Sequence, residues 1–284
     1  MKRRLCFLVI FSLFVSGIFA NSVISDFTKD RVEHFVTYRV RLKSDDFTVA
    51  IEKITALRNK TISQLPKYAI DFEQEKCILE TMYFMEIYER ELDSRGNQKE
   101  LRQTMKSLVQ KNVKCIDSRK KNQISEWLYL VTGDSTSYYM TRSVAATLLY
   151  GFKVKDYYEN ALKINEKHVS AHVSLGNWCF YAPEIFGGGK KKSLSHYEKA
   201  IKYASIPGEK YLAYIAFSQL NFENGKTALA EEFLQNAVEL GLGQKELDVI
   251  SKCNKKGYSN FQYLRNRSGI DAEMSEEEKD EADK

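Results

Sequence analysis

Apolar residues recur at steps of three and four along most of this chain, which is the spacing of one face of an α-helix. Such stripes begin at Phe47, Leu101 and Ile124, and Pro66 interrupts the first of them. Residues 72–92 are apolar on most sides, so we expect that helix to lie between other helices. No run alternates between apolar and polar residues as a β-strand would. The pattern predicts an all-α fold.

Two short polar segments are expected to be turns between these helices. The segment SRGN occupies residues 94–97, and GDSTS occupies residues 133–137. Both are rich in residues that favour turns. In the second, Asp134 or Ser135 is expected to cap the helix that follows.

Three segments share a short signature in which an aromatic residue or leucine is followed three positions later by alanine. The pairs are Tyr158 and Ala161, Tyr197 and Ala200, and Leu234 and Ala237. The alanines are 39 and 37 residues apart. A small residue lets the two helices of a hairpin approach closely, and the larger residue fills the adjacent hole. The repetition predicts helical hairpins stacked in one continuous array over residues 21–270.

The clearest repeats, in residues 152–240, resemble the tetratricopeptide repeat family. In that family the first helix of each hairpin carries Leu-Gly, and the second carries Ala, an aromatic residue and Ala at set steps. Leu175-Gly176 matches the first helix. Ser193, Tyr197 and Ala200 stand at the positions of the second, with Ser in place of the usual Ala. The resemblance implies a solenoid of stacked hairpins and leaves the ligand open.

One hairpin is lengthened by an insertion over residues 182–192. It contains Ala182-Pro183 and Gly187-Gly188, followed by a lysine-rich helix start. This pattern is similar to exported repeat proteins that partner bacterial solute transporters, including the T component of tripartite ATP-independent periplasmic systems. Those proteins have Asp after the glycines, where this chain has Gly189. Pro183 is expected to end the preceding helix, and the glycines to adopt backbone conformations that other residues avoid.

The lysines of this insertion, Lys190, Lys191 and Lys192, begin a helix. Positive charge is unfavourable there because the helix dipole favours acids at its N-terminus. The lysines are therefore either solvated or in contact with an anion. A phosphate-binding loop is excluded, since the segment GGGKKKS lacks both the Gly-Lys-Ser order and a preceding strand.

Residues 1–20 have the pattern of a cleavable signal peptide. Lys2, Arg3 and Arg4 precede an apolar run that extends to Phe19, and Ala20 offers a cleavage site. The alternative is a membrane anchor, but the run is shorter than the roughly 18 to 20 apolar residues that cross a bilayer. No lipidation site closes the segment. We expect a periplasmic or secreted protein without a membrane span.

The formal charge of +5 falls to +2 when residues 1–20 are removed. Residues 271–284 hold eight acids and two lysines and are expected to be a disordered tail, which leaves about +8 on the remainder. A basic body is compatible with an anionic partner or with a solvated surface. The basic residues form no stripe interleaved with aromatic residues, so nucleic acid is not an expected partner.

No catalytic, metal or cofactor motif is present. His168 and His172 are spaced as a helical pair but are not part of HExxH. Four cysteines remain after signal cleavage, and Cys77 and Cys115 are the two that neighbouring helices would bring together. An enzyme is not predicted.

The function expected is that of an exported scaffold that binds a protein partner non-covalently along a concave groove. The alternative is a periplasmic solute-binding or transporter-associated component that holds a small hydrophobic or anionic ligand. A groove open to solvent favours the first function, and a closed apolar channel favours the second. The candidate binding residues are Tyr181, Pro183, Gly187, Gly188, Lys190, Lys191, Tyr211 and Tyr214.

Overall fold

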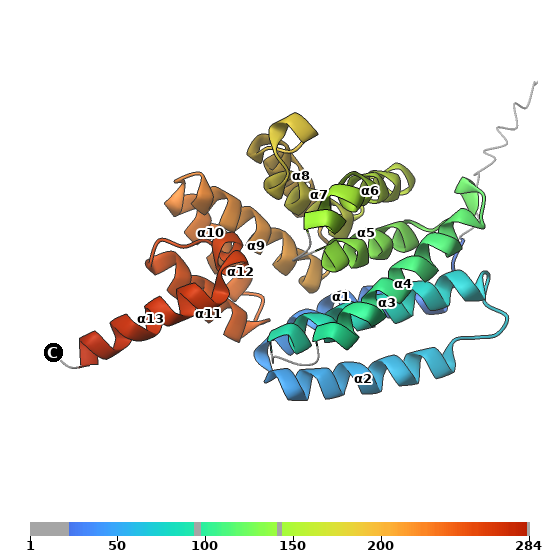
Figure 1. The fold of residues 1–284 in the computed structure, drawn as a ribbon, viewed down its shortest axis with the longest axis horizontal. Coiled ribbons are helices and arrows are strands. Elements are labelled where there is room, and N and C mark those ends of the chain that lie inside the picture. Colours follow the sequence, from blue (N-terminus) through green and yellow to red (C-terminus); the bar gives the residue numbers. More distant parts are fainter. Residues whose placement is uncertain (1–22, 94–97, 141–143, 283–284) are drawn as a thin grey trace, which may run out of the picture.

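The computed structural model describes residues 23–93, 98–140 and 144–282, and all regular structure in these ranges is helical (Figure 1). The all-α prediction is confirmed there. The predicted signal peptide and the SRGN segment lie outside the described residues. The α-helices are α1 (Asp26–Arg41), α2 (Phe47–Gln64), α3 (Phe72–Asp93), α4 (Gln98–Asp117), α5 (Glu126–Met140), α6 (Val144–Ile164), α7 (Val169–Tyr181), α8 (Lys190–Tyr203), α9 (Pro207–Glu223), α10 (Thr227–Val238), α11 (Gln244–Lys255), α12 (Asn260–Arg265) and α13 (Arg267–Ala282). Short 3-10 turns are η1 (Leu42–Ser44), η2 (Lys121–Gln123) and η3 (Glu184–Phe186).

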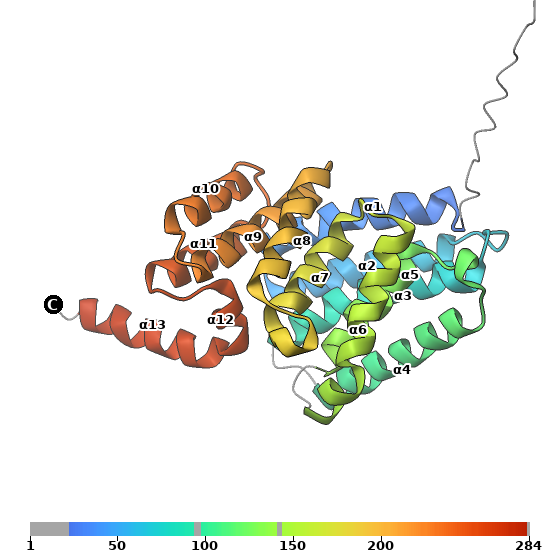
Figure 2. The ribbon, with the colours of Figure 1, turned by 90° about the horizontal axis from the view of Figure 1, so that it is seen from above.

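Successive helices pack as hairpins. The most extensive contacts join α5 to α6, α7 to α8, and α9 to α10, and each hairpin also contacts the next (Figures 1 and 2). The three signature alanines, Ala161, Ala200 and Ala237, are completely buried where the second helices pack. The stacked-hairpin prediction is therefore confirmed, and the alanine repeat marks its register.

A glycine on the first helix of two hairpins meets a tyrosine on the second. A Cβ atom at Gly133 would lie 2.5 Å from the ring of Tyr158, and one at Gly176 would lie 2.3 Å from the ring of Tyr197. Real Cβ atoms do not approach so closely, so only glycine fits at these crossings. The same packing occurs in both hairpins.

The GDSTS segment is not a turn, which corrects the sequence prediction. Residues 133–137 lie inside α5. Gly133 is needed for the contact with Tyr158, and the hydroxyls of Thr132 and Thr136 donate to the carbonyls of Leu128 and Thr132 at 2.6 Å. Hydroxyl residues can satisfy themselves in this way within a helix. A run of small polar residues therefore resembles a turn in sequence while forming a helix.

Helix α1 packs against α9 and also contacts α3. At the start of α9, the backbone of Gly208 lies directly against α1: a Cβ atom there would meet Thr37 Cα and Val36 O at 2.5 Å. The Gly208 amide donates to Thr37 Oγ1 at 3.1 Å. Beyond the end of α1, Lys43 forms an ion pair with Glu246 of α11 at 2.6 Å. The first helix thus connects to the last part of the array.

The C-terminal segment differs from the expected disordered tail. Helix α13 continues to Ala282, and Ile270 at its start is buried with Cys253 and Tyr263. The composition explains the helix, because Glu, Ala and Lys all have high helix propensity.

The four cysteines in the described residues are buried and free. Cys77 on α3 and Cys115 on α4 influence one another's pKa, and Arg119 Nη1 lies 2.9 Å from Cys115 Sγ. A bridge between Cys77 and Cys115 stays a prediction.

No helix in the part of the chain that the structure describes combines the length and apolar character needed to cross a bilayer.

We expect Gly208→Ala to destabilise the fold by about 1–3 kcal/mol, because the added methyl group must separate α1 from α9. Urea unfolding measures the change. Gly151→Ala is the matched control, since a Cβ at that helical position would meet nothing within 4 Å. The control should be neutral or slightly stabilising, as alanine favours helix over glycine. Equal stability of the two variants would contradict the close packing of α1 against α9 at Gly208.

Candidate ligand-binding pocket

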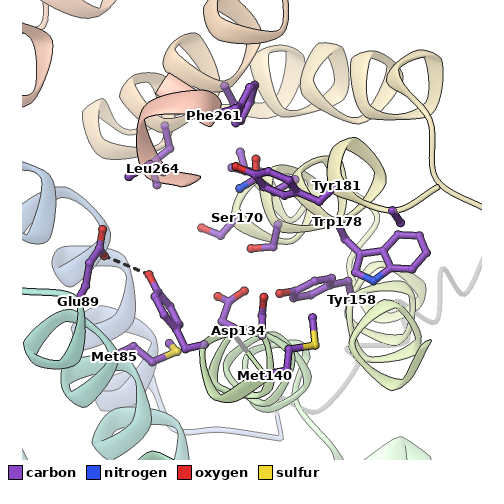
Figure 3. A pocket seen from close by; sticks show the side chains of 18 of the residues that line it. Met85, Glu89, Asp134, Met140, Tyr158, Ser170, Trp178, Tyr181, Phe261 and Leu264 are labelled. Carbon is purple, nitrogen blue, oxygen red and sulfur yellow. Dashed lines mark hydrogen bonds between the residues drawn. The ribbon is translucent and has the colours of Figure 1, made fainter. Parts of the chain in front are cut away.

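A pocket of about 660 Å³ lies on the inner side of the array, bordered by α1, α3, α5, α6, α7, α9 and α12 (Figure 3). This volume is within the range of small-molecule sites. Arg39 of α1 and Lys43 of η1 are part of its wall. The end of α1 and the turn that follows it therefore form one wall of the pocket.

The mouth of the pocket is apolar. Phe152 on α6 and Phe186 on η3 meet edge to face with ring centroids 5.7 Å apart, and Leu148 is 78% exposed beside them. Tyr181 and Phe261 line the pocket between α7 and α12, in contact with one another. Aromatic rings of this kind offer a large apolar contact area to a ligand.

The inner end of the pocket is charged. The ionisable residues that line it are Arg39, Lys43, Glu86, Glu89, Asp134 and Glu246. They come from α1, η1, α3, α5 and α11, so no local sequence pattern groups them. An apolar mouth and a charged interior make the pocket amphipathic.

Two of the four carboxylates are paired with cations. Glu86 contacts Arg39 at 3.2 Å and Arg90 at 2.6 Å, and Glu246 contacts Lys43 at 2.6 Å. Burial by itself would raise the pKa of Glu86, but the charges of Arg39, Arg90 and Lys43 outweigh burial and lower it. Tyr211 also donates to Glu246, at 2.7 Å. These pairs leave both lining cations occupied.

The other two carboxylates, Asp134 and Glu89, lie beside hydroxyl groups. The hydroxyls of Tyr158 and Ser174 are close enough to Asp134 to lower its pKa, and the Tyr138 hydroxyl donates to Glu89 Oε2 at 3.1 Å (Figure 3). Within the described residues, neither carboxylate forms an ion pair. Burial raises the pKa of Asp134 to about 6, and burial together with the nearby charge of Glu86 raises the pKa of Glu89. Each carboxylate therefore lowers the stability of the folded protein when it is ionised.

Of the eight predicted binding residues, Tyr181, Pro183 and Tyr211 line the pocket. Tyr181 stands at the mouth, whereas Tyr211 is fully buried and reaches the pocket beside Glu246. Tyr214 packs on Phe233 with ring centroids 5.7 Å apart and does not line the pocket.

The predicted insertion is a structural turn that contributes to the mouth. As expected, α7 ends at Tyr181, before Pro183. Gly187 has a left-handed backbone with φ 92°, and Gly188 packs so closely on the Ala182 carbonyl that no side chain fits. The turn places Phe186 beside Phe152. Gly187 and Gly188 thus shape the mouth without lining the pocket.

The lysines of the insertion lie outside the pocket. Lys190 Nζ donates to the Glu223 carbonyl at 3.0 Å and contacts Glu223 Oε2 at 3.4 Å. Lys192 Nζ donates to the Gly187 carbonyl at 2.9 Å. Lys191 is exposed and lines no part of the pocket. The contacts of Lys190 and Lys192 therefore hold the turn to its own hairpin and to α9.

The predicted histidine pair does not form a common site. His168 packs its ring on Trp127, while His172 Nδ1 contacts His196 Nδ1 at 3.1 Å and His172 Nε2 contacts the Glu166 carbonyl at 2.9 Å. No group of three or more potential metal-ligating side chains occurs among the described residues.

No protein-family model matches the chain, and no curated protein matches it.

The charged interior is not predicted by the sequence. Asp134 lies in a segment that resembles a turn, and no pattern in the sequence distinguishes Arg39, Glu86 or Glu89 from surface charges. One signal could have identified Asp134: aligning Gly133 with Gly176, and Tyr158 with Tyr197, places Asp134 on a first helix of a hairpin, next to a crossing. Burying a carboxylate at that position costs free energy unless a cation or a hydrogen-bond donor compensates its charge.

We expect Asp134→Asn to stabilise the protein at neutral pH. Because the pKa of Asp134 is raised on folding to about 6, the folded state binds its proton more tightly than the unfolded state. The proton on Asp134 therefore contributes fully to the free energy of unfolding below the unfolded-state pKa near 4, and this contribution is lost as pH rises through 6. At neutral pH the loss is at most about 3 kcal/mol, and less for this half-buried group.

Urea unfolding at pH 7.5 and pH 4.5 tests this expectation. Asp134→Asn should exceed the native protein in stability at pH 7.5, and the difference should shrink at pH 4.5. Asp156→Asn, on the exposed face of α6, is the control and should show no such pH-dependent gain. A pH-independent difference for Asp134→Asn would contradict the expectation.

Proposed function

We propose that this protein is a non-catalytic binding protein whose pocket holds one small molecule with a substantial apolar part. The observation that carries the proposal is a single cavity with an apolar mouth and a charged inner end, because a site for a protein segment would instead be a groove running along the array. The volume, the aromatic mouth and the few polar groups inside all fit a small-molecule site.

Binding fits the lining better than catalysis does. The residues that line the pocket include no histidine and no cysteine. The lysine that lines the pocket, Lys43, forms an ion pair with Glu246. Burial lowers the pKa of Lys43, but the charges of Glu246 and Glu89 outweigh burial and raise this pKa above its usual value. A protonated, paired lysine is a poor nucleophile or base.

The proposal includes the periplasm as the compartment in which the protein binds its ligand. The predicted signal peptide and the resemblance to transporter-associated repeat proteins support this compartment. There, a pocket protein could hold a solute before it is transferred to a membrane transporter. The resemblance supports the compartment and the general role, and the pocket supports the kind of ligand.

A second candidate function, docking of a protein partner, is favoured by the apolar rim of the mouth. We define the rim as Leu148, Leu149, Phe152, Ile185 and Phe186, all of them exposed. Ile185 is 87% exposed, and Phe152 and Phe186 contact one another across the rim. Exposed apolar patches of this kind often mark interaction sites. A partner docked there would face the pocket opening.

Titration with the apolar fluorophore N-phenyl-1-naphthylamine tests the pocket. We expect a single binding site whose emission increases on burial. Ala216 lines the pocket, so the indole ring of Ala216→Trp would occupy space that the fluorophore needs. Binding should weaken on the order of tenfold or more, which corresponds to a loss of about 1.4 kcal/mol or more in binding free energy.

The matched control is Ala228→Trp on the exposed surface of α10, which should leave binding unchanged. Circular dichroism of both variants checks that each is folded. Unchanged binding by folded Ala216→Trp would show that the fluorophore binds elsewhere, and no binding by the native protein would contradict the proposed function.

The rim is tested separately by the double substitution Phe152→Asp and Ile185→Asp. If a protein partner docks on the rim, its stoichiometric co-purification from the bacterial envelope should be lost in this variant. Retention of the partner would contradict docking at the rim, whatever the fluorophore result.

A further inference from the structure

We propose that the pocket selects a ligand whose head is a protonated amine, held by Asp134 and Ser170 and attracted by the second carboxylate, Glu89, with its apolar part directed to the aromatic mouth. The inference depends on the proposed function, because it names the class of small molecule that this same pocket binds. Its basis is the arrangement of charges and hydrogen-bond partners within the cavity.

The charge balance of the lining leaves two carboxylates for a ligand. Arg39 is held by Glu86 and Lys43 by Glu246, with Arg90 adding a second cation at Glu86. Asp134 and Glu89 remain, with hydroxyl groups and no directly paired cation beside them in the described structure. A cationic head would supply the missing countercharge. An anionic head would meet two carboxylates, and the cations it needs already have partners.

Ser170 gives an independent indication of a ligand. It is only 6% exposed and points into the pocket near Asp134 (Figure 3). Its side-chain hydroxyl makes no hydrogen bond to the protein in the described part of the chain, and it is open to the cavity instead of sealed from it. A ligand N–H can therefore donate to this hydroxyl without breaking a protein contact. An ammonium group has three N–H donors; Asp134 and Ser170 provide neighbouring acceptors for them, and Glu89 adds a second negative charge to the same cavity.

The aromatic groups around the carboxylates suit the same ligand. Tyr158 lies beside Asp134, and Trp178 lies close to Tyr158 (Figure 3), while Tyr138 also lines the pocket. Burial raises the pKa of both tyrosines well above the usual range, so they stay protonated, and Tyr138 donates to Glu89. Ring faces attract ammonium groups, and the mouth then accommodates the attached carbon chain. The ligand class is therefore an amphiphilic amine.

Four ten-carbon probes that differ only in their heads test this inference: decylamine, decyltrimethylammonium, decanol and decanoate. Each is titrated calorimetrically into the mature protein at pH 7.5, below its micelle concentration. Decylamine should bind about tenfold or more tightly than decanol, because charge-assisted hydrogen bonds are the stronger class. Decyltrimethylammonium lacks N–H donors and should be weaker than decylamine. Decanoate should be the weakest.

Variants assign the preference to the proposed residues. Asp134→Asn and Glu89→Gln should each weaken decylamine on the order of tenfold while decanol changes little. Ser170→Ala should have a smaller effect in the same direction. Glu232→Gln, an exposed acid on α10, is the control with the same change in net charge and should bind all probes normally. Circular dichroism confirms that each variant is folded.

The outcomes separate the two proposals. If decanol binds as tightly as decylamine, or decanoate binds most tightly, the amine assignment is overturned while a small-molecule pocket remains. Equal affinity for the two cations would overturn the role of the N–H donors and of Ser170. If neither these probes nor N-phenyl-1-naphthylamine binds, the proposed function itself fails.

Discussion

The close contact between α1 and α9 is the constraint on which the rest of this structure depends. Gly208 lets the α9 backbone rest directly on Val36 and Thr37 of α1. With this contact, the end of the first helix and the turn that follows it carry Arg39 and Lys43 toward acids on α3 and α11. One wall of the pocket and part of its charged interior therefore have the same origin.

The charges inside the pocket are better explained by binding than by stability. A buried ion pair seldom gains more from attraction than it loses by desolvation, so Glu86 and Glu246 with their partners chiefly fix how α1, α3 and α11 are aligned. Asp134 and Glu89 have no cation in direct contact within the described residues, and hydroxyl donors compensate a carboxylate less well than a paired cation does. Residues that cost stability without a structural gain are expected at functional sites.

Much of the architecture could be predicted from sequence because helix periodicity and the Ala161, Ala200 and Ala237 repeat are local signals. They specify which face of a helix is buried and how a hairpin packs. They do not specify which distant helix completes the burial. Lys43 and Glu246 are 203 positions apart, and no periodicity connects them. The pocket was missed because it is made by such long-range contacts, whereas its mouth, next to the insertion at Pro183, was found.

The two polar features that attract attention in the sequence have opposite meanings in three dimensions. The lysines after Gly189 stand out as a charged run, yet Lys190 and Lys192 bond to backbone carbonyls and hold a turn in place. Asp134 is a single acid in a segment that resembles a turn, yet it lies inside a helix and faces a cavity. A surface charge is easily solvated and needs no explanation. An acid that faces a largely apolar cavity is less well hydrated than one on the surface, and a donor on a ligand can replace the hydration that it lacks.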